Sequence, residues 1–281
     1  MKLDCVLTAV NNNKLYLDCI PFFIKSWKKL YPNVDIKIIL INEVIPDEYL
    51  EYKDFFIIFK PIHRVLTSFT SQYIRLLYPS ILNYQNGVLT TDIDMIPLNK
   101  IYFTKYIEPY SNDKFIYYRG NTCFHFKQIA ICYNVATPEI WRNVFNINCI
   151  NDINIRLKTV FTNNKIKKGH GKMGWDTDQQ HLYKHISEWN KNTNNFIGLN
   201  ENTTKFLRLS KKKIKFNNQN SCSKILIKQI SMGKYVDYHL PKPINKYYVK
   251  NNYVLKLIQA QENNHPNNSD KPIEKCDKDD V

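Results

Sequence analysis

The sequence lacks an apolar run long enough to cross a bilayer. Its longest apolar patches, such as residues 38–41, have the length of a strand. No small-residue cleavage site follows the first lysine, so we do not expect a signal peptide either. Together these absences predict a soluble cytoplasmic protein without a membrane span; if the chain is viral, the compartment would be the host cytoplasm.

Paired cysteines and glycine-rich phosphate loops are missing as well. The seven cysteines are scattered singly with no Cys-x-x-Cys pair, which argues against a zinc ribbon. An odd count without a signal peptide also argues against a disulfide framework. Neither a P-loop nor a Rossmann glycine fingerprint is present, and there is no internal repeat. We expect the cysteines to be small buried hydrophobic residues.

Positive charge is in excess. Lys and Arg number 40 against 25 Asp and Glu, giving a formal net charge of +15. Such a surplus is typical of nucleic-acid binding, but Lys, Asn, Ile and Tyr are also the residues of AT-rich codons. The basic runs, residues 165–168 and 211–213, are short. A solvated lysine surface is therefore favoured, a nucleic-acid partner is not expected, and an anionic substrate is equally compatible. The composition also suits a large DNA virus, a protist or a low-GC bacterium.

Strand and helix patterns alternate through the first hundred residues. Strands are predicted over residues 3–10, 34–42, 55–59 and 88–91, and helices over 14–30 and 71–82, with Pro79 kinking or ending the second helix. This order predicts an α/β fold, a mainly parallel central sheet flanked by helices. Ligands of such sheets bind beyond the carboxyl ends of the strands near the switch point. Asp92 and Asp94 follow the fourth strand directly.

The second half is less regular. Strands are predicted over residues 114–118 and 129–135 and around 196, 206 and 235–239, and helices over 138–145, 153–161 and 176–189. Residues 262–281 are polar and read as a disordered tail. We therefore expect one domain over residues 1–261.

The segment Asp92-Ile93-Asp94 carries the strongest chemical signal. Two carboxylates one residue apart at a strand end can share a divalent cation such as Mn²⁺ or Mg²⁺, which bridges them to phosphate oxygens. Surface Asp pairs are common in turns, but the flanks here are apolar. We interpret the pair as a metal site at Asp92 and Asp94.

This region resembles a known family. The strand, the Asp-x-Asp and the following Pro-Leu resemble the DxD motif of GT-A glycosyltransferases. Upstream, Arg75 and residues 76–82 after it, which include Pro79, are similar to the helix before DxD in glycogenin-like and galactosyltransferase-like family 8 enzymes, where an Arg is followed by a Leu-x-x-Pro-x-Leu pattern. The resemblance covers residues 1–98 well and is patchy beyond.

The resemblance implies roles for individual residues. It implies that Asp94 binds the metal, that Asp92 binds the metal and the donor ribose, and that Arg75 contacts the nucleotide sugar or braces the carboxylates; a structural ion pair is the alternative for Arg75. The first strand would hold the base and ribose through four residues: Thr8, Ala9, Val10 and Asn11. Residues 1–98 would form the nucleotide-sugar half of a GT-A domain, and 99–261 the acceptor half.

Two later segments complete the expected site. Family 8 enzymes end with a metal-binding His, a spacer and Lys-Pro-Trp; His239 and Lys242 resemble a shortened version, implying a third metal ligand and a diphosphate contact, with a structural His as the alternative. The glycine-rich residues 169–174 precede Trp175, Asp176 and Asp178. Here we expect the acceptor, with Asp178 favoured over Asp176 as the catalytic carboxylate; a helix cap is the alternative.

The leading hypothesis is a metal-dependent glycosyltransferase that moves a sugar, from a UDP-sugar by preference, to a glycan or protein acceptor. The resemblance suggests retention of configuration, and inversion stays open. One alternative is a basic, non-catalytic binding protein on a degenerate transferase fold. A phosphatase of the haloacid dehalogenase type is a weaker alternative, because it places its Asp-x-Asp after the first strand. The sequence does not indicate an oligomeric state.

Overall fold

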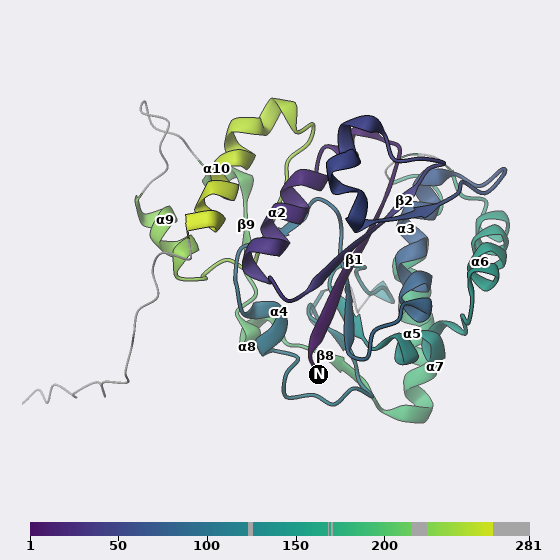
Figure 1. Cartoon of the computed structure of the whole chain (residues 1–281). Coiled ribbons are helices and arrows are strands. Elements are labelled where there is room, and N and C mark those ends of the chain that lie inside the picture. The colour runs from purple at the N-terminus through teal and green to yellow at the C-terminus, as the bar shows by residue number, and fades with distance from the viewer. Residues whose placement is uncertain (123–125, 168, 170, 215–223, 261–281) are drawn as a thin grey trace, which may run out of the picture.

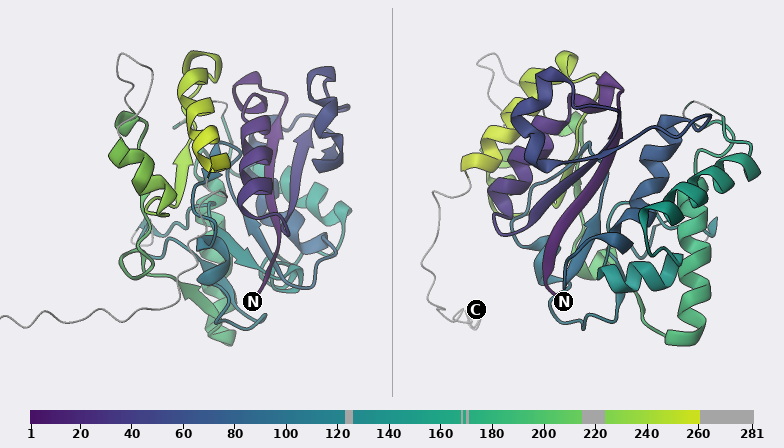
Figure 2. Two further views of the ribbon diagram at one scale, coloured as in Figure 1. Left: turned by 60° about the vertical axis from the view of Figure 1, so that its left-hand side comes forward. Right: turned by 45° about the vertical axis from the view of Figure 1, so that its right-hand side comes forward.

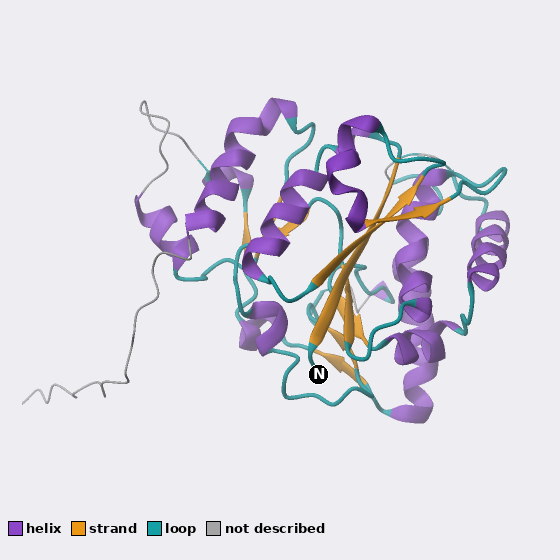
Figure 3. Ribbon diagram, in the orientation of Figure 1, coloured by secondary structure: helices purple, strands orange, loops and turns teal. Residues whose placement is uncertain are grey.

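The computed structural model describes residues 1–122, 126–167, 169, 171–214 and 224–260. In these residues a seven-stranded sheet forms the centre, with helices on both faces (Figures 1 and 3). In sheet order its strands are β3 (Phe56–Phe59), β2 (Asp35–Ile41), β1 (Leu3–Asn11), β4 (Gly87–Thr90), β7 (Asn134–Ala136), β6 (Phe115–Tyr117) and β8 (Phe196–Gly198). Only β7 runs antiparallel to its neighbours. The predicted α/β class with a mainly parallel sheet is confirmed.

Each face of the sheet carries its own helical layer (Figure 2). One face is covered by α2 (Ile20–Leu30) and α10 (Tyr248–Gln259), and the other by α3 (Thr67–Leu77), α5 (Pro138–Phe145), α6 (Ile150–Asn163) and α7 (Thr177–Thr193). Strand β1 shows the period of two that this requires. Val6 and Val10 pack into the core under α2, whereas Cys5 and Leu7 pack into the core under α3. Four shorter α-helices are also present: α1 (Lys14–Leu17), α4 (Tyr102–Lys105), α8 (Glu201–Thr204) and α9 (Lys224–Ser231).

The single helix expected over residues 14–30 is wrong, because the chain forms two helices. Helix α1 ends at Leu17 and α2 begins at Ile20. Pro21 has no N–H to donate, and its ring would clash with the carbonyl four residues earlier. The proline is tolerated only in the first turn of a new helix, where it lies.

The helix before the Asp-x-Asp segment ends just ahead of Pro79, as predicted. Helix α3 ends at Leu77, and a short 3₁₀ helix, Tyr78–Ile81, contains Pro79. The expected strand over residues 129–135 is mostly wrong, because only Asn134–Ala136 joins the sheet. Before it, the Asn134 amide donates to the carbonyls of Ala130 and Ile131 at 2.8 and 2.9 Å, and Ile129 N–H donates to Gln179. These bonds satisfy the backbone outside the ladder.

A second, three-stranded sheet was not anticipated from the sequence. It consists, within the described residues, of β5 (Met95–Pro97), β10 (Asp237–His239) and β9 (Arg208–Leu209), with β10 in the middle. Met95 pairs with His239, and the Leu240 N–H donates to the Asp94 carbonyl at 2.8 Å. The C-terminal strand is thereby fixed beside the Asp-x-Asp segment.

The strand order places a switch point between β1 and β4. From β1 the chain proceeds outward through β2 to β3 and then returns to the opposite side of β1 as β4. Helices that leave in opposite directions open a crevice at the carboxyl ends of such strands. Asn11 ends β1 and Thr90 ends β4, so this crevice lies beside Asp92.

Three further expectations concern the chain as a whole. No helix in the described ranges is long and apolar enough to span a membrane. Of the described cysteines, Cys5, Cys19 and Cys132 are buried as expected, whereas Cys149 is exposed. The predicted tail, residues 262–281, lies outside the described residues, and the division into two halves at residue 98 stays a prediction.

Candidate functional site

A cavity of about 440 Å³ occupies the switch-point crevice. It is walled by the end of β1, by α1 and α3, by the segment after β4, by described residues between 166 and 175, and by the end of β10 with the segment after it. The lining residues that the sequence had singled out are Ala9, Val10, Asn11, Arg75, Asp92, Asp94, Gly169, Gly174, Trp175, His239 and Lys242. Segments from the beginning, middle and end of the chain therefore meet in one space.

Arg75 connects the helix before the cavity to the Asp-x-Asp turn. Its guanidinium is buried, pairs with the Asp92 carboxylate and donates to the Thr91 carbonyl at 3.1 Å. It also lies 3.8 Å from Asp178. Burial opposes the charge of Arg75, but Asp92 and Asp178 outweigh burial and raise its pKa. Arg75 is thus a fixed cation between two carboxylates, and not a solvated surface arginine.

Asp94 is the second acidic residue of the cavity and has two basic partners. His239 Nε2 lies 3.0 Å from Asp94 Oδ2, and the Lys242 ammonium pairs with the same oxygen. Burial alone would raise the pKa of Asp94, but His239 and Lys242 outweigh it and lower the pKa. Burial likewise opposes the charge of Lys242, yet Asp94 raises its pKa. The shortened His-Leu-Pro-Lys segment therefore reaches the Asp-x-Asp turn.

The two aspartates at the start of α7, Asp176 and Asp178, lie in different surroundings. Asp178 is buried behind Arg75, and burial raises its pKa to about 6, although Arg75 and the Gln179 N–H partly offset the rise. Asp176 instead accepts hydrogen bonds from Gln128 and Gln180 at 2.5 and 2.9 Å. Neither lines the cavity, but only Asp178 contacts a residue that does.

The end of β1 lines the cavity with three of its four predicted residues: Ala9, Val10 and Asn11. Thr8 does not line it; its hydroxyl is buried and has no hydrogen-bond partner within the described residues. Thr8 lies three residues before the end of β1 and is fully buried, so its side chain does not reach the cavity at the strand end.

Sequence reasoning missed several lining residues. Tyr16 lies under Lys242, whose Nζ is 4.0 Å from the ring centroid. Gln72 and Lys167 also line the cavity. Gln72 precedes Arg75 by three residues, so its place on the same helical face was readable from the sequence. Nothing local marks Tyr16, because its partner is 226 residues away along the chain.

The donor set of the cavity suits a divalent cation in its chemistry. Asp94 and His239 offer an oxygen and a nitrogen close together, and Asp92 lines the same space. Carboxylates suit Mg²⁺ and Mn²⁺, and imidazole suits transition metals. Among the described residues, however, no three His, Cys, Asp or Glu side chains form a preassembled metal-binding group. Asp92 and Asp94 are instead paired with Arg75 and Lys242.

Comparisons with known proteins place this chain beside glycosyltransferase structures. The glycosyltransferase GlyE of Streptococcus pneumoniae TIGR4 matches with 12% identity and a TM-score of 0.48, over 96% of this chain and 66% of GlyE. The galactosyltransferase LgtC, in complex with donor and acceptor sugar analogues, matches with 10% identity and a TM-score of 0.46, over 90% and 95% of the two chains. WbbM, a bifunctional glycosyltransferase, matches with 10% identity and a TM-score of 0.41, over 93% and 52%.

No family model and no curated protein match the sequence. The chain spans just under two thirds of GlyE and about half of WbbM. At TM-scores below 0.5, none of these likenesses carries a conclusion about the activity of this chain.

Proposed function

We propose that this protein is a glycosyltransferase that transfers a sugar from a nucleotide-sugar donor, a UDP-sugar by preference, to a glycan or protein acceptor. The observation that carries the proposal is the charge arrangement of the switch-point cavity. Two carboxylates, Asp92 and Asp94, face it together with Arg75, His239 and Lys242. This is a site for a diphosphate with its counter-cation, at the place where sheets of this kind bind nucleotides.

The basic residues suit a leaving diphosphate. When the donor's glycosidic bond breaks, negative charge grows on the diphosphate oxygens, and fixed cations stabilise it without reorganising. Lys242 is better placed than Arg75 to bind the diphosphate. Its ammonium stands on a flexible stem, and it can exchange its Asp94 partner for a phosphate oxygen. Arg75 contacts Asp92, Thr91 and Asp178, so its positive charge stays at a fixed position beside the diphosphate.

A divalent cation is part of the proposal. Asp94 and His239 would hold Mn²⁺ or Mg²⁺, and Asp92 would hold the metal or the donor ribose. The imidazole favours Mn²⁺. Bound there, the ion would act as a Lewis acid on the diphosphate. Lys242 would then exchange its Asp94 partner for phosphate oxygens, so that its ammonium would stay paired with a negative charge.

The acceptor is proposed to enter from the side of Ile166, Gly174 and Trp175, where Trp175 offers an aromatic face to a sugar. Asp178 was the preferred catalytic base. Because it lies behind Arg75 and does not line the cavity, its contacts support a different role, which is positioning Arg75. The stereochemical course stays open.

The deciding experiment is hydrolysis of a panel of UDP-sugars with and without Mn²⁺. We expect metal-dependent release of UDP from one donor. Asp94→Asn should reduce it by roughly a hundredfold or more, since it removes a charge on which metal binding depends. Asp54→Asn is the matched control, because Asp54 is exposed and lies outside the cavity.

Three outcomes separate the possibilities. Release that survives Asp94→Asn would contradict the assigned metal site. UDP binding without turnover would mean that the acceptor is required. Absence of both turnover and Mn²⁺-dependent binding of UDP or GDP by calorimetry would refute the transferase proposal.

A further inference from the structure

A second cavity adjoins the candidate site. It measures about 420 Å³ and lies between the loop after β3 and the end of α6. Its lining residues are His63, Arg64, Val65, Lys158, Phe161, Thr162, Lys165 and Ile166. We refer to it as the basic pocket.

The basic pocket and the switch-point cavity share a wall. Ile166 lines both of them. Val65 lines the basic pocket and its neighbour Leu66 lines the cavity, and Lys167 continues from Ile166 into the cavity. A molecule that fills the acceptor side of the cavity therefore reaches the basic pocket once it extends past Ile166.

The charge of the basic pocket has one sign. Its permanently charged side chains are Arg64, Lys158 and Lys165, with no carboxylate in the lining. Within the described ranges, none of these three cations forms an ion pair with an acidic side chain. All three side chains are exposed to solvent, which screens their mutual repulsion, and each is available to pair with an incoming anion.

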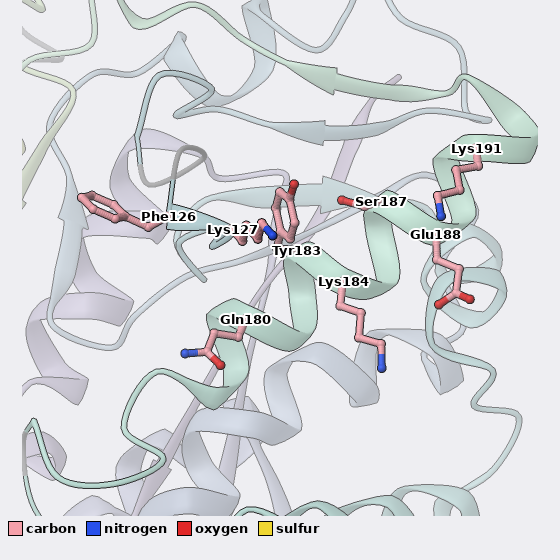
Figure 4. Close-up of a pocket in the computed structure, with 8 residues that line it drawn as sticks. All are labelled: Phe126, Lys127, Gln180, Tyr183, Lys184, Ser187, Glu188 and Lys191. Atoms are coloured by element: carbon pink, nitrogen blue, oxygen red, sulfur yellow. The ribbon is translucent and has the colours of Figure 1, made fainter.

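Two other cavities show that this arrangement is not simply the average surface of a basic protein. One, of about 640 Å³, lies along α7 and contains Glu188 among its lysines (Figure 4). The other, of about 870 Å³, contains Glu201 among its lysines. Both mix the two signs, and neither shares a lining residue with the switch-point cavity.

The floor of the basic pocket packs against the hydrophobic core, and two residues of its rim have left-handed backbone conformations. Phe161, Val65 and Ile166 pack against the core beneath α3, and the Phe161 ring lies 5.6 Å from that of Phe69. On the rim, Arg64 and Lys165 both adopt left-handed backbone conformations, with φ of 64° and 48°. Each costs about 1 kcal/mol relative to glycine, so long cations stand at two positions that glycine would fill with less strain.

We propose that the basic pocket binds an anionic group, a phosphate or a carboxylate, carried by the acceptor. This inference rests on the proposed transferase function, because it takes the switch-point cavity to be the donor site. The anion would pair with Lys158, Lys165 and Arg64, while an apolar part of the acceptor lies on Phe161 and Ile166. The acceptor is thereby assigned to acidic glycans or sugar phosphates and not to neutral glycans.

Direct binding tests this without knowledge of the natural acceptor. Calorimetric titrations at low ionic strength would use glucose 6-phosphate, glucuronate and glucose as probes. We expect one or both anions to bind and glucose not to bind, and the two anions distinguish phosphate from carboxylate recognition. Lys158→Ala/Lys165→Ala should weaken anion binding about tenfold or more through the loss of charge-assisted hydrogen bonds.

The matched control is Lys184→Ala/Lys191→Ala, which removes the same charge from the cavity of Figure 4. Equal weakening by both double variants would mean non-specific attraction to a basic surface and would overturn the inference, as would no anion binding at all. Affinity for UDP with Mn²⁺ should be unchanged in both variants. Pocket-specific anion binding by a protein that does not bind UDP would refute the transferase proposal while supporting the anion pocket.

Discussion

At the scale of single residues, Arg75 is the side chain that contacts aspartates from two different segments of the chain. It pairs with Asp92 from the turn after β4 and lies 3.8 Å from Asp178 at the start of α7. Asp178 is more deeply buried than Asp92. The raised pKa of Asp178 shows that burial outweighs the attraction of Arg75.

Asp178→Asn should show this in the pH dependence of stability. An acid whose pKa is raised on folding stabilises the fold when neutral, and that contribution is lost as pH rises from about 4 to about 6. At pH 4.5 the variant should be more stable than the wild type by only about 1 kcal/mol, because most of that contribution is lost above this pH. At pH 7.5 it should be more stable than the wild type by up to roughly 3 kcal/mol. Urea unfolding at both pH values measures the difference.

The opposite sign would be equally informative. If the stability of the variant relative to the wild type falls between pH 4.5 and pH 7.5, then the attraction of Arg75 for the Asp178 carboxylate outweighs the cost of burying it. A transfer rate that falls while the pH profile keeps its shape would support the positioning role. A profile that loses its acidic limb would restore Asp178 as the base, because a base must be deprotonated to act.

At the scale of elements, the loop before α7 depends on one glycine. Gly174 has a φ of +81°, and a Cβ there would lie 2.7 Å from the Ile166 side chain. Ile166 forms the wall between the cavity and the basic pocket. Gly171 is a matched comparison, because its φ is +67° but no atom lies within 4 Å of a Cβ.

Gly174→Ala should therefore cost more than Gly171→Ala. Both substitutions carry about 1 kcal/mol of backbone strain, and Gly174→Ala adds roughly 1–3 kcal/mol of overpacking. Chemical unfolding gives the stabilities, and UDP titration should show weaker binding for Gly174→Ala alone. Equal losses of stability in the two variants would mean that the Ile166 side chain moves aside without a loss of packing energy.

Strand β10 carries His239 to the site and is held by Asp237. Arg208 donates to both Asp237 oxygens, with 2.7 Å to Oδ2, and the Tyr133 hydroxyl donates to Oδ2 at 2.8 Å. Asp237→Asn leaves Arg208 without a counter-charge. We expect a loss of about 3 kcal/mol, the low end for breaking a buried pair, because Arg208 keeps partial exposure.

The same variant should weaken Mn²⁺ binding, since β10 fixes His239 beside Asp94. Calorimetry measures the affinity, and unfolding the stability. A variant that loses stability but binds Mn²⁺ as tightly as the wild type would show that His239 is held by β5 alone.

At the scale of the whole molecule, the surplus of positive charge separates the leading hypothesis from the binding-protein alternative. If the switch-point cavity is a nucleotide site, UDP with Mn²⁺ should stabilise the fold by about 2.7 kcal/mol at 100 times its dissociation constant. That corresponds to a rise in melting temperature of about 5 °C or more. Differential scanning fluorimetry with UDP, Mn²⁺ and both together measures it.

An oligonucleotide of random sequence is the comparison for that experiment. Stabilisation by the oligonucleotide that disappears steeply with salt, together with no effect of UDP, would favour the non-catalytic basic protein. Stabilisation by UDP that requires Mn²⁺ and is lost in Asp94→Asn would favour the transferase.

Much of the fold follows from local signals. The α/β class, the order of the first four strands and the ends of α3 and α5 were predictable, because apolar periodicity and proline act over a few residues. The split at Pro21 was readable too and was missed. The strand expected at residues 129–133 failed for a different reason: its apolar side chains are buried without joining the sheet.

The sequence by itself determined which polar and charged residues stand at the end of β1 and after β4, and thereby the candidate site at the switch point. Only the tertiary structure decided which of those charges meet. Arg75 and Asp92 are 17 residues apart, but Asp94 and Lys242 are 148 apart. The pairing of β5 with β10 joins them, and three-residue strands of this kind leave almost no periodic trace. Burial of Asp178 and the shared wall at Ile166 arise in the same way, because they depend on packing between segments that no local pattern relates.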